Sequence, residues 1–190
     1  MKRPEAYIKP FAGVRHAHYA AAAALELRAA IAGRFGEITI LRLETYAEAL
    51  RYAANRAPAR AIQAQFSLSW AVAAAFMQGD LGPAAYTDAA LADPALRRLE
   101  GLVELAEDTA LTKAEQRGAR LIVTLANGES HQASIAAMAG DPGQALNAEA
   151  VLAKCQRFAG PVIGEAQMAR LSAMILVADG TAPHDFFAGM

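Results

Sequence analysis

The sequence predicts one α+β domain over residues 1–190, with a mostly antiparallel sheet of four or five strands flanked by helices. Three observations predict this class. A chain of 190 residues is long enough to bury one sizeable core. Stretches of helical periodicity are interspersed with short runs rich in β-branched residues. An Asn-Gly pair separates two extended runs in RLIVTLANGESHQASIAA, which predicts a β-hairpin with a type I′ turn.

The chain is expected to begin with a strand, a helix and a second strand. The segment AYIKPF predicts a short strand that ends at Pro10, because proline has no backbone donor for a sheet. Apolar residues then recur at helical spacing from His16 to about Ala32, and Gly33 supplies the stop. The run EITILRLET predicts the second strand.

Mostly helical segments fill the rest of the chain. One helix is expected around YAEALRYAAN, and a single helix over AIQAQFSLSWAVAAAFMQGD. Asp93 and Pro94 mark a helix start, and GLVELAED predicts a strand before the hairpin. Asn147 is expected to cap a helix that runs through Ala159, and a last helix spans about Glu165 to Ala178.

Composition and charge exclude several classes of protein. Apolar residues make up 55% of the chain, but its longest apolar stretch contains Glu26 and Arg28, so we expect no membrane span. Without a secretory signal, and with Cys155 as the only cysteine, the expected location is cytoplasmic. Residues 1–60 hold ten Lys/Arg and five Asp/Glu, whereas residues 61–190 hold eight and fourteen. This asymmetry favours a small polyanionic ligand over a nucleic acid, which requires a denser basic surface.

The cationic segment KPFAGVRHAH is the strongest candidate site. Lys9 and Arg15 carry permanent positive charge, and His16 and His18 lie at a predicted helix N-terminus, where backbone N–H groups also favour an anion. A histidine held near neutrality there is suited to general acid or base catalysis. Residue spacing alone leaves an alternative open, in which these are ordinary surface cations with one packed histidine. His16 and His18 would point about 200° apart on a helix, so we expect no metal site.

Five segments follow one another along nearly the whole chain: KPFAGVRHAH, AQFSLSWAVAAAFMQGDLG, YTDAALADPALRRLEGLVEL, ARLIVTLANGES and LNAEAVLAKCQRFAG. In order and approximate spacing, this series resembles the C-terminal half of the MmgE/PrpD family. That family includes 2-methylcitrate dehydratase, cis-aconitate decarboxylase and iminodisuccinate epimerase.

The resemblance implies a cofactor-free enzyme that acts on small di- or tricarboxylates by proton transfer next to a carboxylate. Lys9 and His16 match positions where family members carry a lysine and a histidine that face the substrate. Arg15 matches a frequent arginine, and His18 a position of more variable residue type. The resemblance therefore implies catalytic roles for His16 and Lys9, and substrate binding by Lys9, Arg15 and His18. Val14 departs from members that carry a cysteine or histidine there.

The resemblance also implies a missing partner. Family members are more than twice as long, and their N-terminal all-helical domain completes the active site and supplies most of the dimer interface. Our first hypothesis is a lid domain or small subunit of a lyase or isomerase, in a homo- or hetero-oligomer completed by a helical-domain chain. The alternatives are a non-catalytic module that binds a carboxylate or a protein, and an inactive truncated chain. The first hypothesis predicts an exposed apolar face, and the module predicts a polar, self-contained surface.

Overall fold

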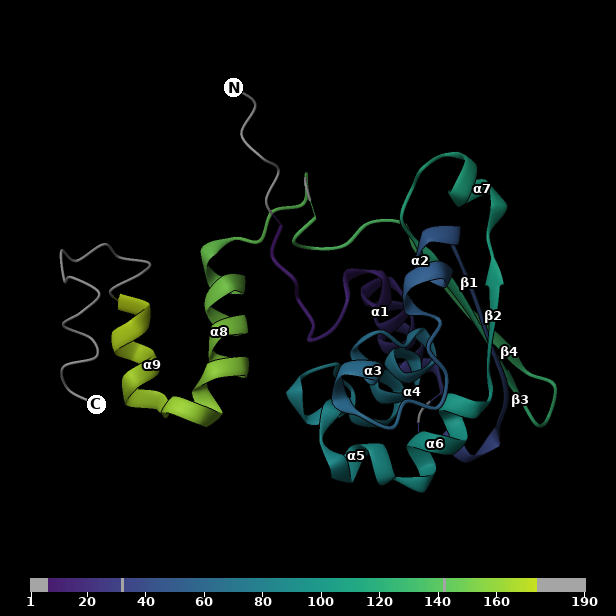
Figure 1. Cartoon of the computed structure of the whole chain (residues 1–190), viewed down its shortest axis with the longest axis horizontal. Helices are drawn as coiled ribbons and strands as arrows, with labels where there is room; N and C mark the ends of the chain where they lie inside the picture. Colours follow the sequence, from purple (N-terminus) through teal and green to yellow (C-terminus); the bar gives the residue numbers. More distant parts are fainter. Residues whose placement is uncertain (1–6, 32, 142, 174–190) are drawn as a thin grey trace. The chain divides into compact units, whose positions relative to one another are not determined.

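The chain forms two compact units, which we describe separately. A computed structural model describes residues 7–31, 33–141 and 143–173. The larger unit runs from Lys9 to Asp141 and contains the sheet and the helices α1 to α7 (Figure 1). The other unit contains the helices α8 and α9.

The larger unit is built on a four-stranded mixed sheet in the order β2-β1-β3-β4. Its strands are β1 (Ile38–Thr45), β2 (Val103–Glu107), β3 (Ala119–Leu125) and β4 (Ser130–Ile135). The pairs β1/β3 and β3/β4 are antiparallel, as predicted, but β1 and β2 are parallel. The parallel pair is possible because the chain between these strands makes a long helical crossover.

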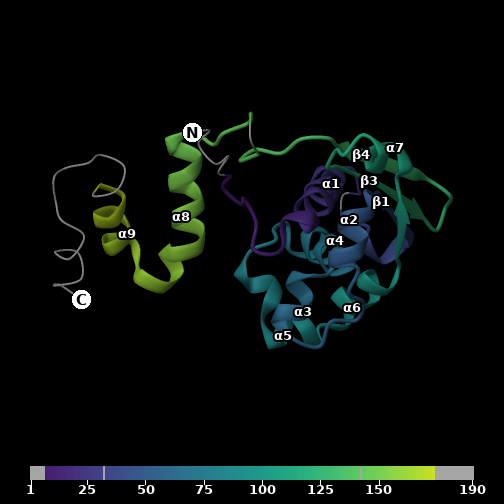
Figure 2. The ribbon, with the colours of Figure 1, turned by 45° about the horizontal axis from the view of Figure 1, so that its top comes forward.

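The sheet buries one face beneath the helices α1 (Arg15–Ile31) and α4 (Leu68–Gln78), as Figures 1 and 2 show. Leu41, Leu43 and Leu121 on that face are fully buried, whereas the opposite face carries exposed Arg42 and Arg120, both paired with Glu44. Most of the alanines of α1 are fully buried. Their small side chains allow α1 to pack closely against both α4 and the sheet.

Short helices connect these elements, and several begin at side-chain caps. Asp93 Oδ1 accepts hydrogen bonds from the backbone N–H groups of Ala95 (2.7 Å) and Leu96 (3.2 Å), which confirms the predicted helix start. The remaining α-helices of this unit are α2 (Ala47–Ala53), α3 (Ala61–Gln65), α5 (Asp88–Ala92), α6 (Pro94–Gly101) and α7 (Thr109–Lys113), and the 3₁₀ helices are η1 (Phe35–Glu37) and η2 (Pro83–Tyr86).

The strand predicted over AYIKPF is wrong for residues 7–11, which lie within the described part of the chain and are irregular. Long-range bonds explain the difference. Just after this segment, the N–H of Ala12 donates to the carbonyl of Leu81 (2.9 Å), and that of Val14 donates to the carbonyl of Gln65 (3.0 Å). These bonds tie the chain just after the segment to the loop after α4 and to the end of α3, and not to a sheet edge. The predicted strand-helix-strand order therefore fails at its first element.

The helix predicted over residues 61–80 is interrupted by an extended residue. Ser67 has φ −126° and ψ 112°, and its hydroxyl accepts the N–H of Trp70 (3.1 Å), so that α4 starts afresh. Ser67 also forms an isolated antiparallel bridge with Ala54. This pairing with a distant segment separates α3 from α4, whereas Gly79 ends α4 in the left-handed conformation, at the predicted boundary.

The predicted hairpin is confirmed, but its type I′ turn is wrong. A type I′ turn requires positive φ at both central residues, and among the described non-glycine residues only Ala57 and Glu115 have positive φ. The N–H of Gly128 instead donates to the carbonyl of Leu125 (2.9 Å), and Gly128 itself has φ 85°. The connection is therefore a three-residue loop that places Gly128, and not Asn127, in the left-handed region.

The second unit consists of α8 (Ala148–Ile163) and α9 (Glu165–Ser172). Asn147 Oδ1 accepts the N–H of Ala150 (2.8 Å), which confirms the predicted cap. The helix continues four residues beyond the predicted end, to Ile163, with Pro161 inside it. The end predicted for the last helix, Ala178, lies outside the described residues.

Candidate functional site

The candidate site begins in the segment before α1. Lys9 is exposed, and its Nζ donates to the carbonyl of Gly13 (3.3 Å). Gly13 has φ 138°, and a Cβ added there would lie 2.8 Å from the hydroxyl oxygen of Tyr86. A glycine is therefore required where this segment turns into α1.

Arg15, the first residue of α1, is paired with a carboxylate of the chain itself. Its Nη2 lies 2.7 Å from Oδ1 of Asp141, and the Tyr19 hydroxyl donates to Oδ2 over the same distance. Burial by itself would raise the pKa of Asp141, but hydrogen bonds from Tyr19 and Arg15, together with the charge of Arg15, lower it overall. A substrate carboxylate that bound Arg15 at this position would have to displace Asp141.

Replacing Asp141 with asparagine should lower the free energy of unfolding by about 1–3 kcal/mol at neutral pH, because the partly buried guanidinium of Arg15 loses a charged partner. The carboxyl of Asp141 has a lower pKa in the folded protein than its usual value of about 3.9. The stabilisation is therefore present above that value and is lost as the pH falls through the folded-state pKa. Urea unfolding at several pH values should show the two proteins converging at low pH, and a constant gap would contradict this role.

His16 lies among aromatic rings. Its Nδ1 is 2.7 Å from the hydroxyl oxygen of Tyr46, and its ring stacks on that of Tyr52, with centroids 5.9 Å apart and an interplanar angle of 17°. Burial lowers the pKa of His16, and the positive charges of Arg117 and Arg15 lower it further against the opposing effect of Glu48. His16 is thus predominantly neutral at pH 7.

The structure separates His18 from His16. His18 is 2% exposed, and its ring meets that of Phe11 edge-on at 5.6 Å. Burial, followed by the charge of Lys9, lowers the pKa of His18 to about 4. Its Nε2 is buried and has no hydrogen-bond partner within the described ranges. His18 is therefore a packed, neutral histidine, whereas His16 is only partly buried.

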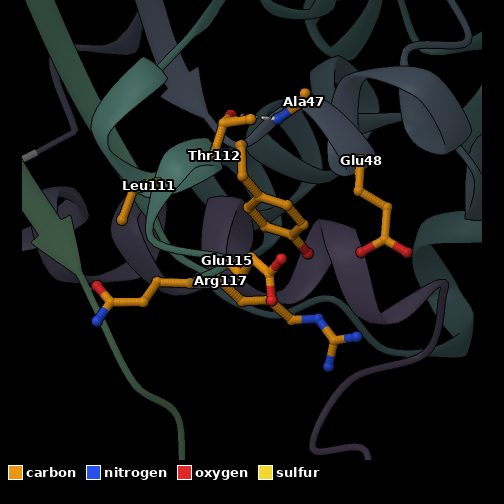
Figure 3. Close-up of a pocket in the computed structure, with 8 residues that line it drawn as sticks. Ala47, Glu48, Leu111, Thr112, Glu115 and Arg117 are labelled. Atoms are coloured by element: carbon orange, nitrogen blue, oxygen red, sulfur yellow. Dashed lines mark hydrogen bonds between the residues drawn. The ribbon is translucent and has the colours of Figure 1, made fainter.

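A cavity of about 530 Å³ adjoins the environment of His16 and shares Tyr46 with it (Figure 3). Glu48 enters it from α2, whereas Glu115 and Arg117 enter from the loop after α7, and Figure 3 shows the charged ends of Glu48 and Arg117 approaching from opposite sides. Ala47 N donates to Thr112 Oγ1 (3.0 Å), which joins the two walls. The lining residues are Tyr46, Ala47, Glu48, Leu111, Thr112, Glu115, Gln116 and Arg117.

Arg117 and Tyr46 are the site residues that sequence reasoning missed. Arg117 is partly buried and forms no ion pair with any residue in the described part of the chain. Glu115, two positions earlier, has φ 53°, a strained conformation for a residue other than glycine. No local motif marks this loop, so only the fold shows that its cation lies near His16.

Exposed apolar side chains lie next to this site. Tyr52, which stacks on His16, is 54% exposed, and Ile62 and Phe66 on and just after α3 are 59% and 42% exposed. The N–H of Asn55 donates to the carbonyl of Phe66 (3.4 Å), which brings the end of α2 beside the end of α3. We call Tyr52, Ile62 and Phe66 the apolar patch.

The described residues form neither a metal-binding cluster nor a membrane-spanning helix. No group of three or more His, Cys, Asp or Glu side chains among them is arranged to hold a metal ion. No helix in the described ranges is long and apolar enough to cross a membrane.

The mixed sheet under a layer of alanine-rich helices, with histidine and arginine at the start of α1, defines an α+β domain. The MmgE/PrpD C-terminal domain model matches residues 11–179. The chain therefore belongs to the MmgE/PrpD family and carries its C-terminal domain, as the sequence resemblance implied. No curated protein sequence matches the chain.

Proposed function

We propose that this chain supplies the lid half of a cofactor-independent MmgE/PrpD lyase or isomerase. The enzyme acts on a small di- or tricarboxylate by dehydration, decarboxylation or epimerisation. The observation that carries this proposal is His16, neutral and hydrogen-bonded to Tyr46, beside a cavity lined by Arg117, in a domain of this family. Arg117 forms no ion pair with any described residue. These groups combine a neutral hydrogen-bonding imidazole with positive charge, and both can stabilise the negative charge that develops in chemistry next to a carboxylate.

The proposed roles follow from exposure and charge. Exposed Lys9 attracts the substrate and donates a proton to it, and His16 contacts the reacting part of the substrate. Arg15 binds a substrate carboxylate by exchanging Asp141 for it, since the guanidinium already holds a carboxylate there. His18 is proposed to contribute to the binding site indirectly. Its buried ring packs against Phe11 and so supports the segment that carries Lys9.

A separate chain with a helical domain is proposed to complete the site. The apolar patch supports this arrangement, because exposed apolar side chains next to His16 offer a docking surface. Lys9 is open to water in this chain, where its attraction for an anion is weak. A partner that covers the patch would exclude water and strengthen that attraction.

Calorimetric titration of citrate and related acids tests the binding half of the proposal. Lys9→Ala should weaken binding by about 2- to 5-fold, as expected for an exposed charge. His16→Ala should weaken binding by roughly 10-fold, because it removes a hydrogen-bonding partner of the ligand. Lys154→Ala is the matched control, since it removes one positive charge from α8 in the other unit. Equal affinity for these acids in wild type, Lys9→Ala and His16→Ala would rule out this binding site.

Purification from the native source tests the partner. Mass spectrometry of the isolated complex should reveal a chain with an all-helical MmgE/PrpD domain, in the same particle as this chain. Recovery of the chain alone, with full carboxylate affinity and no turnover, would instead establish the carboxylate-binding module.

A further inference from the structure

The hydrogen bond between His16 and Tyr46 specifies which ring nitrogen of His16 carries the proton. Tyr46 is the single residue between β1 and α2, and it is 4% exposed. Within the described part of the chain, Nδ1 of His16 is the hydrogen-bond partner of the Tyr46 hydroxyl, at 2.7 Å. A hydroxyl and an imidazole nitrogen can form this bond in either direction, so the surroundings of Tyr46 must decide between them.

The phenol has a proton to donate. Burial raises the pKa of Tyr46 well above its usual value, so the hydroxyl stays protonated at neutral pH. If Nδ1 of His16 donated to the phenol oxygen, the phenol proton would have no protein acceptor among the described residues. Donation from Tyr46 to Nδ1 satisfies both groups, and is therefore the favoured direction.

We propose that Tyr46 is a positioning residue that holds neutral His16 in its Nε2–H tautomer. His16 then offers the substrate a hydrogen-bond donor and not a base. This inference rests on the proposed function. The Nε2–H group then donates to a substrate carboxylate oxygen, on which negative charge grows when the neighbouring carbon loses its proton. The base that takes this proton is a residue of the partner chain. His16 itself gains and loses no proton in this step.

The rest of the environment is consistent with this role. The stacked ring of Tyr52 fixes the plane of the imidazole. The charged groups that act on His16 come from three elements: Glu48 on α2, Arg117 on the loop after α7, and Arg15 on α1. His16 is only partly buried, and its Nε2 is not a fully enclosed atom without a partner, unlike Nε2 of His18.

Long-range ¹H–¹⁵N correlation spectra of the full chain, labelled with ¹⁵N at histidine, test the tautomer. At about pH 8, where His16 is neutral, we expect a protonated Nε2 and an unprotonated Nδ1, with the signals assigned by their loss in His16→Gln. Tyr46→Phe should give a mixture of both tautomers and a raised His16 pKa, because the bond that favours the neutral form is lost. Tyr52→Phe is the matched control, since it keeps the stacked ring, and should leave the tautomer unchanged.

A protonated Nδ1 in wild type would overturn the proposal, and so would identical His16 spectra in wild type and Tyr46→Phe. The wild-type spectrum decides the question even if Tyr46→Phe fails to fold. The tautomer is measured without substrate, whereas carboxylate titration tests the proposed function. An Nε2–H tautomer in a protein that binds no carboxylate would therefore support the positioning role and count against the function.

Discussion

Replacing Trp70 with alanine should reduce the free energy of unfolding by about 3–5 kcal/mol. Trp70 is fully buried on α4, and its Nε1 donates to the carbonyl of Ala85 (2.9 Å). The guanidinium of Arg97 lies 5.0 Å from the centre of its ring. The substitution leaves a cavity in the core, an unpaired carbonyl and a cation without its aromatic partner, so the three losses act in the same direction.

Urea unfolding followed by circular dichroism measures this effect, because Trp70 is the only tryptophan and its fluorescence disappears with the substitution. Trp70→Phe should cost less, since it keeps most of the buried ring and loses mainly the Nε1 bond. Tyr52→Ala, which removes a half-exposed ring, is the surface control and should change stability by about 1 kcal/mol or less. A similarly small effect for Trp70→Ala would contradict the placement of this side chain in the core.

Replacing His16 with alanine should reduce the turnover of the assembled enzyme by roughly 10²–10³-fold, which is typical for the loss of one donor to a developing negative charge. The free energy of unfolding should change much less than in Trp70→Ala, because His16 is only partly buried. The measurement is kcat with the partner chain present.

His131→Ala is the matched control for this prediction. His131 lies on β4, where its Nε2 contacts Oε1 of Glu129 (2.6 Å), and it does not line the cavity. Turnover in this variant should stay close to wild type. Wild-type turnover in His16→Ala would remove His16 from the mechanism, and an equal loss in both variants would show that the effect is not specific to the site.

Elements fixed by local chemistry were predictable from sequence. The caps at Asp93 and Asn147 act within three residues of each helix start, so their signals are visible in a short window. The predictions of a strand at residues 7–11 and of an unbroken helix through Ser67 were wrong because contacts with distant residues decide these segments. Ala12 and Val14 bond to Leu81 and Gln65 and not to a strand, and the pairing of Ser67 with Ala54 interrupts the helix.

The candidate site divides in the same way. Residue type and spacing predicted that Lys9, Arg15, His16 and His18 lie near the start of one helix, and the structure confirms this location. The sequence did not predict which residues these four side chains contact. The partners of these residues come from distant positions: Asp141 binds Arg15 across 126 residues, and Tyr46 binds His16 across 30. Such pairings depend on the path of the chain through the sheet, so no local sequence pattern predicts them.

The most direct test of the central claim is deuterium exchange from D₂O into small carboxylic acids, measured by proton NMR on the complex purified from the native source. Dehydration and epimerisation remove a proton from a carbon next to a carboxylate, whereas decarboxylation adds a proton to the carbon that loses CO₂. In D₂O, deuterium therefore enters the acid or the product formed from it in all three reactions. We predict exchange into at least one di- or tricarboxylate, and strongly reduced exchange when the complex is rebuilt with His16→Ala. No exchange into any acid by a complex that contains the helical-domain chain would contradict the proposed function.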